Sequence, residues 1–154
     1  MLRIPLSGEQ MDGVSIALIM VIGFSVGLLA WWIRYRIDVR DIVTNGGLKS
    51  YYGDLIKRIM RFFPDAVTVS DTPMRMAIES YDETKGVKMM LFFDINTDKN
   101  LNVQGDVIPD PERWPGMSPK KFCWDQIPLG YGQADEARIV FYIKKDMVFN
   151  PATF

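Results

Sequence analysis

The feature that most constrains this chain is a run of 21 residues without a charge, from Gly13 to Ile33, bracketed by Asp12 and Arg34. As an α-helix with a rise of about 1.5 Å per residue, the run spans about 30 Å, the thickness of a bilayer's hydrocarbon core. Core helices of soluble proteins seldom contain uncharged runs of this length. We therefore predict a single transmembrane helix at residues 13–33, preceded by a short tail at residues 1–12.

The charges on either side of the run argue against a cleaved signal peptide. Such a peptide carries its basic residues before the apolar stretch and small residues after it. Here Arg3 is offset by Glu9 and Asp12, whereas seven Lys and Arg residues follow between positions 34 and 61. Because positive charge flanks membrane helices on the cytoplasmic side, we predict an uncleaved anchor with a cytoplasmic C-terminal domain. In an enveloped or internal viral membrane, the terms inside and outside would have to be redefined.

Two smaller patterns in this region suggest membrane contacts. The C-terminal end of the run carries aromatic and cationic residues that suit the headgroup layer: Trp31, Trp32, Arg34, Tyr35 and Arg36. Gly23 and Gly27 form a G-x-x-x-G pair that permits close approach of another helix, although glycine is common in membrane helices regardless. The run holds no ionisable side chain, which disfavours ion conduction through this helix alone.

Composition narrows the possible functions. The 18 Lys and Arg residues nearly balance 19 Asp and Glu residues, so we predict no nucleic-acid partner. Histidine is absent, which removes the commonest general base and transition-metal ligand. The single cysteine, Cys123, lies between two aromatic residues and is expected to be a small buried hydrophobe. No glycine-rich phosphate loop occurs, and we predict no cofactor.

The region after the run divides into a juxtamembrane connector and a soluble domain. The connector, residues 34–47, ends at Asn45-Gly46-Gly47, which is expected to break a helix that continues past the bilayer. The domain, residues 48–154, begins with apolar residues at helical spacing over residues 48–63. This amphipathic helix packs on the domain's own core or lies with its basic face on an anionic membrane surface.

Beyond Pro64 the pattern changes to β-strands. Alternating residues and turn signals predict strands at 66–69, 74–81 and 87–95 in an antiparallel meander, and a strand buried on both sides at 137–144. Residues 105–136 hold five prolines and four glycines, which predict a long irregular loop that is ordered and functional. The expected fold is therefore α+β: a transmembrane helix, an amphipathic helix and an antiparallel sheet of about four strands.

The predicted loop supplies two sets of candidate site residues. Four aromatic residues are interpreted as partner-contact anchors, with a small local core or stacking platforms as alternatives: Trp114, Phe122, Trp124 and Tyr131. Six carboxylates are candidates for acid–base chemistry, although their spacing specifies no pair: Asp106, Asp110, Glu112, Asp125, Asp135 and Glu136.

Alternating oxygen side chains after the third strand resemble the start of a calcium loop. Asp94, Asn96 and Asp98 are the candidate ligands. However, Lys99 occupies the position of the sharp-turn glycine, and Gly105 that of the bidentate glutamate. Asp and Asn are also common in β-turns, so we expect a hairpin loop here rather than a metal site.

These observations lead to one leading functional hypothesis and two alternatives. We predict a non-catalytic, single-pass structural subunit of a larger membrane-associated complex, such as secretion, respiratory or photosynthetic machinery or a membrane-containing virion. Its predicted partners are the lipid bilayer, other protein subunits of the complex, and another helix in contact with the transmembrane segment. The alternatives are a membrane-tethered enzyme that uses the loop carboxylates and a ligand- or calcium-binding module.

Overall fold

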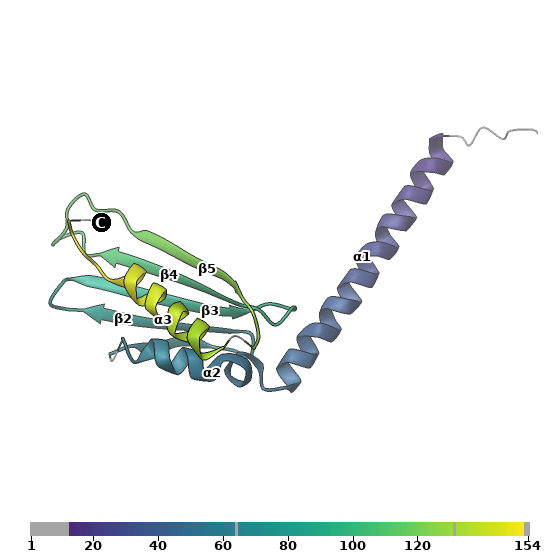
Figure 1. The fold of residues 1–154 in the computed structure, drawn as a ribbon. Helices are drawn as coiled ribbons and strands as arrows, with labels where there is room; N and C mark the ends of the chain where they lie inside the picture. Colours follow the sequence, from purple (N-terminus) through teal and green to yellow (C-terminus); the bar gives the residue numbers. More distant parts are fainter. Residues whose placement is uncertain (1–12, 64, 131, 153–154) are drawn as a thin grey trace, which may run out of the picture. The chain divides into compact units, whose positions relative to one another are not determined.

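The computed structural model describes residues 13–63, 65–130 and 132–152. It contains three helices and five strands in the order α1-α2-β1-β2-β3-β4-β5-α3, which confirms the predicted α+β class (Figure 1). The chain divides into two compact units, Met1–Ile37 and Asp38–Phe154.

The first unit consists, in its described part, of α1, whose full extent is Gly13–Thr44. The residues of α1 from Ile16 to Ile37 are all exposed. The last turns of α1 belong to the second unit, where Ile42 is fully buried in the core. The helix therefore continues well past the uncharged run, as the sequence predicted.

The predicted helix break lies between α1 and α2 (Gly47–Met60). Gly46 and Gly47 both have positive φ angles, which suit glycine. A Cβ atom on Gly47 would lie 2.3 Å from the main-chain oxygen of Pro73, so this position also requires a residue without a side chain. The main-chain N–H of Leu48 donates to that same oxygen at 2.7 Å, and this bond ties the start of α2 to the sheet.

The second unit is built on a five-stranded antiparallel meander in the order β1-β2-β3-β4-β5. The strands are β1 (Val67–Asp71), β2 (Arg75–Asp82), β3 (Val87–Ile95), β4 (Leu101–Pro109) and β5 (Lys120–Ile127). Alternate residues of β3 and β4 face the core, as in the cross-strand pair Phe93 and Val103, both fully buried. The strands predicted at 66–69, 74–81 and 87–95 are confirmed as β1, β2 and β3.

Helices α2 and α3 (Gln133–Met147) contact one another and pack against the sheet (Figure 1). The apolar face of α2 is buried, which confirms the core interpretation of the amphipathic helix. Its Tyr52 hydroxyl lies 2.8 Å from the carbonyl oxygens of both Lys99 and Ile127. Gly105 of β4 leaves room for Met147 of α3, whose Sδ atom would lie 2.4 Å from a Cβ at this position.

Two sequence predictions are wrong. Residues 105–136 are not one irregular loop, because β4 extends to Pro109 and β5 covers Lys120–Ile127. The prolines lie at strand ends and in the connections, where a missing N–H breaks no central ladder bond. The predicted strand at 137–144 lies within helix α3, because the sheet has an apolar face that a helix covers.

Candidate functional site

Helix α1 presents the largest exposed apolar surface of the described chain. Its most apolar 18-residue stretch has a mean hydropathy of 2.4, and none of it is buried. Leu18, Phe24 and Trp31 are each at least 60% exposed, far beyond what a helix that packs in its own protein shows. This one helix among the described residues is long and apolar enough to cross a membrane.

Four of the predicted headgroup residues form two pairs on α1, and the two members of each pair lie one helical turn apart. The rings of Trp31 and Tyr35 stack with centroids 5.7 Å apart. The guanidinium of Arg36 lies 5.0 Å from the centre of the Trp32 ring. Arg34 falls within both pairs in the sequence and is exposed. Aromatic rings and guanidinium groups clustered on one turn provide the mixed chemistry that a membrane interface favours.

The predicted helix-packing glycines have open surroundings. A Cβ atom on Gly23 or Gly27 would meet no described atom within 4 Å beyond the helix's own backbone. The surface around this pair is therefore accessible to another helix, and the helix–helix contact stays a prediction.

The described members of the aromatic set pack on the core of the second unit while remaining partly exposed. The indole N–H of Trp114 donates to the carbonyl of Lys85 at 2.8 Å, and that of Trp124 to an Asp146 carboxylate oxygen at 3.1 Å. Phe122 and Trp124 stack on β5 with centroids 6.2 Å apart. These side chains hold a loop, a strand and α3 together, and their role as partner anchors stays a prediction.

The fourth member of that set, Tyr131, lies outside the described residues. The N-terminal tail at residues 1–12 and Pro64, beyond which the sequence pattern changes to β-strands, also lie outside them.

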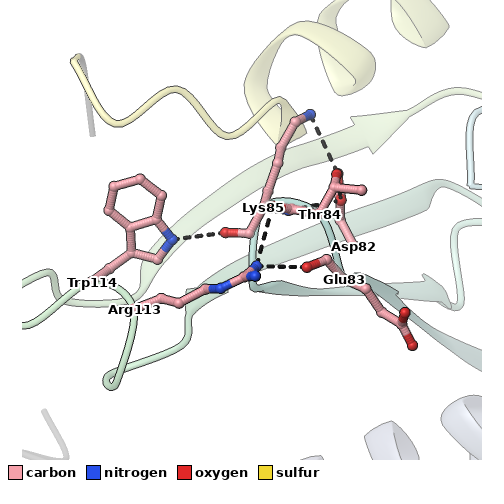
Figure 2. Close-up of polar contacts among 6 residues, drawn as sticks. All are labelled: Asp82, Glu83, Thr84, Lys85, Arg113 and Trp114. Carbon is pink, nitrogen blue, oxygen red and sulfur yellow. Dashed lines mark hydrogen bonds and ion pairs between the residues drawn. The ribbon is translucent and has the colours of Figure 1, made fainter.

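A polar clamp on the β2–β3 turn was missed by the sequence analysis (Figure 2). The Arg113 guanidinium donates to the carbonyls of Glu83 at 2.6 Å and Thr84 at 3.1 Å. Asp82 accepts hydrogen bonds from the Thr84 hydroxyl at 2.6 Å and from the Lys85 main-chain N–H at 3.1 Å. The Thr84 hydroxyl is the main reason that the pKa of Asp82 is lowered. The clamp fixes the connection between β4 and β5 against the neighbouring turn.

The calcium-like segment forms the β3–β4 hairpin, as the turn interpretation predicted. Asp94 forms an ion pair with Arg75, and the Asn96 side-chain oxygen accepts the main-chain N–H of Asn100 at 2.9 Å. Asp98 is exposed at the turn. Within the described part of the chain, no group of three or more His, Cys, Asp or Glu side chains is placed to hold a metal ion.

Lys99, at the tip of this hairpin, forms an ion pair with Asp41. Its ammonium lies 2.9 Å from the Asp41 carboxylate, and its φ of 63° shows that the turn takes a left-handed conformation without glycine. The hydrogen bond and charge of Asp41 raise the pKa of Lys99. This pair attaches the hairpin to the last turns of α1.

The loop carboxylates occupy several elements. Asp106 of β4 lies 3.8 Å from the Lys121 ammonium, and Asp110 accepts the main-chain N–H of Glu112 at 2.9 Å. The buried Glu136 of α3 forms an ion pair with Arg58 at 2.9 Å that lacks hydrogen-bond geometry. These contacts lie within the second unit and contribute to its fold.

Two further carboxylates, Asp125 and Asp135, line one groove of about 620 Å³ beside Arg138. Both carboxylates are exposed, and exposed carboxylates are usually solvated. Asp125 also accepts a hydrogen bond from the Cys123 thiol at 3.0 Å, and this bond raises the pKa of the thiol. Cys123 is exposed, so the prediction of a buried cysteine is wrong.

The sheet face opposite the two helices mixes apolar side chains with ion pairs. Cross-strand register places Ala77 beside Phe92, and Glu79 beside Met90, on this face. Three ion pairs lie among them, Arg75–Asp94, Lys88–Glu79 and Lys121–Asp106. We call this surface, formed by the outward residues of β2, β3, β4 and β5, the open sheet face. Its partly exposed apolar groups resemble the composition of protein–protein interfaces.

Comparisons of the chain with protein-family models, with curated proteins and with solved structures found no match.

Proposed function

We propose that this chain is a single-pass membrane protein whose cytoplasmic α+β domain has a non-catalytic, structural role in a larger membrane-associated assembly. The observation that carries the proposal is the complete exposure of the apolar stretch of α1. In water such a surface would associate or aggregate, whereas a bilayer removes it from water. The exposed aromatic and cationic turn at its C-terminal end suits the headgroup region.

The structural role is supported by how the domain uses its polar groups. Trp114, Trp124 and Arg113 each donate a hydrogen bond within the unit, and these bonds stabilise loops and strands. The open sheet face offers apolar groups such as Phe92 and Met90 to a protein partner. A rigid domain with a partly apolar sheet face, held at a membrane, is suited to assembly.

Membrane insertion is tested by alkaline carbonate extraction of membranes that contain the full chain. We expect the wild-type chain to stay in the pellet and Ile22→Arg to move toward the supernatant, because an arginine near the centre of a span costs about 2.5–3.5 kcal/mol. Ile22→Leu is the matched control and should behave as wild type. A wild-type chain found wholly in the supernatant would refute the anchor.

Orientation is tested with the native Cys123, the single cysteine of the sequence and exposed in the domain. A membrane-impermeant maleimide should label it only after the cell membrane is permeabilised. Labelling of intact cells would instead place the domain outside.

Contact with other subunits is tested by photo-crosslinking from the open sheet face. A photoreactive residue at Tyr81, 47% exposed on β2, should crosslink to another protein in native membranes. The same residue at Ser50, exposed on α2, is the control. Equal yields from both positions would argue against the open sheet face as the contact.

A further inference from the structure

A groove between α2 and α3 combines exposed apolar and cationic side chains on the helix layer. It measures about 480 Å³, and Phe62, Ala137, Val140 and Phe141 supply its apolar lining. Phe141 is 61% exposed and Phe62 42% exposed, so both rings have apolar area that the described chain does not cover. Large aromatic groups left in water in this way mark a surface that another phase or molecule covers.

The rim of the groove is cationic. Arg58, Arg61 and Lys144 line it, and none of its described lining residues is acidic. The Lys144 ammonium lies 4.5 Å from the centre of the Phe62 ring, so charge and aromatic surface adjoin directly. Arg58 is neutralised by the buried Glu136, whereas Arg61 and Lys144 form no ion pair among the described residues.

The open sheet face differs in its charge arrangement. There Arg75, Lys88 and Lys121 each have an acidic partner on the same face. Arg61 and Lys144 therefore give the groove unpaired positive charge that these cations of the open sheet face lack, although the chain as a whole has a net charge of −1. A surface of this kind is complementary to an anionic one.

We propose that this groove binds the anionic headgroups of the bilayer in which α1 is anchored. The inference rests on the proposed function, because only an anchored domain is held at a membrane. Eight residues of chain connect Arg34, the first charge after the apolar run, to Ile42 in the domain core, so even fully extended chain would hold Ile42 within about 30 Å of Arg34. Aromatic groups beside unpaired Arg and Lys side chains are the chemistry by which helices bind anionic lipid surfaces.

The test uses the full chain in nanodiscs of phosphatidylcholine, with or without about a third phosphatidylglycerol. An environment-sensitive fluorophore is attached at Ala137 in the groove, as Ala137→Cys in a Cys123→Ser background, and doxyl-labelled lipid serves as the quencher. The matched control is the wild-type chain labelled at Cys123 of β5, which is remote from the groove lining.

We expect lipid quenching at position 137 only in discs that contain phosphatidylglycerol, and we expect it to weaken in 0.5 M salt because ions screen the attraction. The Arg61→Gln and Lys144→Gln substitutions should each reduce the docking equilibrium roughly fivefold. Lys121→Gln on the open sheet face should leave it unchanged. Phe141→Ser should also weaken docking, whereas Tyr81→Ser should not.

Three results would overturn the proposal. Quenching at Cys123 in place of position 137 would mean that the domain presents its sheet to the lipid. Equal quenching in both lipid compositions would mean that anionic headgroups have no role. No quenching at position 137 would mean that the groove does not contact lipid and is instead open to a protein partner. If the chain stays in carbonate-washed membranes in that last case, the anchor stands and the groove proposal alone fails, whereas a chain extracted by carbonate contradicts both.

Discussion

Because β4 and α3 are in close contact at Gly105, we expect that adding one methyl group there measurably lowers the stability of the fold. A Cβ there would lie 2.4 Å from the Met147 Sδ atom and 3.2 Å from two ring atoms of Trp124. Carbon and sulfur atoms normally pack beyond about 3.5 Å, and Met147 is 1% exposed, so it has little room to move. Overpacking of this kind costs about 1–3 kcal/mol, offset by about 0.4–1 kcal/mol from a less flexible unfolded chain.

We therefore expect Gly105→Ala to lower the free energy of unfolding by about 1–2 kcal/mol and Tm by about 4–8 °C. The assay is thermal unfolding of the full chain in mild detergent, followed by near-ultraviolet circular dichroism. Gly53→Ala on α2 is the matched control, because its Cβ would meet nothing within 4 Å and alanine favours a helix by about 0.5–1 kcal/mol. Combining Gly105→Ala with Met147→Ala should remove most of the cost of the first change. An unchanged cost in that background, or a Gly105→Ala chain as stable as wild type, would refute the reasoning.

Three further predictions concern polar groups of the domain. Tyr52→Phe should cost about 1–2 kcal/mol of stability in the same melt, because it leaves two main-chain carbonyls without its buried hydroxyl. The Thr84 hydroxyl lowers the pKa of Asp82 in the folded chain. The Asp82 carboxylate therefore stabilises the fold at pH values above about 3.9, its pKa in the unfolded chain, and this stabilisation is lost as the pH falls through its lower pKa in the folded chain. Asp82→Asn should thus be less stable than wild type by about 0.5–1 kcal/mol at pH 7 and equally stable near pH 2, and a pH-independent difference would contradict this. Asp125→Asn should speed alkylation of Cys123 at pH 8, measured by mass spectrometry, because Asp125 raises the pKa of that thiol; an unchanged rate would refute the link.

The N-terminal half of the fold was predictable because its signals are local. The uncharged run, the glycine break at Gly46 and Gly47, and the apolar periodicity of α2 each depend on a few neighbouring residues. The strands β1 to β3 are separated by two short turns, residues 72–74 and 83–86, which contain the turn-forming residues Pro73 and Gly86. These patterns required no knowledge of distant contacts.

The strand β4 was not predicted, because its centre looks unlike a strand. Gly105 and Asp106 weaken the local β signal, yet alternate residues from Leu101 to Pro109 are buried. Gly105 is explained by its close neighbours Trp124 and Met147, the second of which lies 42 positions later in the sequence. A residue chosen for a long-range contact cannot be recognised from its neighbours.

The sequence predicts a strand within α3 because the five consecutive apolar residues 139–143 fit both the two-residue period of a strand and the 3.6-residue period of a helix. The buried positions Glu136, Ile143 and Met147 instead follow helical spacing. The deciding factor is tertiary, because the meander exposes an apolar face that a helix must cover.

The candidate sites were predictable to different degrees. The aromatic and cationic turn of α1 follows from the sequence alone, since its residues are one turn apart. The clamp of Arg113 on the β2–β3 turn and the groove shared by α2 and α3 join segments far apart in the chain. Neither has a local signature that would reveal it before the fold is known.

The most direct test of the proposed function is extraction of the chain from its native membranes in mild detergent, followed by native gel electrophoresis and mass spectrometry of the comigrating proteins. A membrane-anchored structural subunit predicts that the chain migrates with a defined assembly much larger than its own 17.7 kDa and enters solution only with detergent. A chain that is released without detergent, or that migrates as a lone monomer, would contradict it.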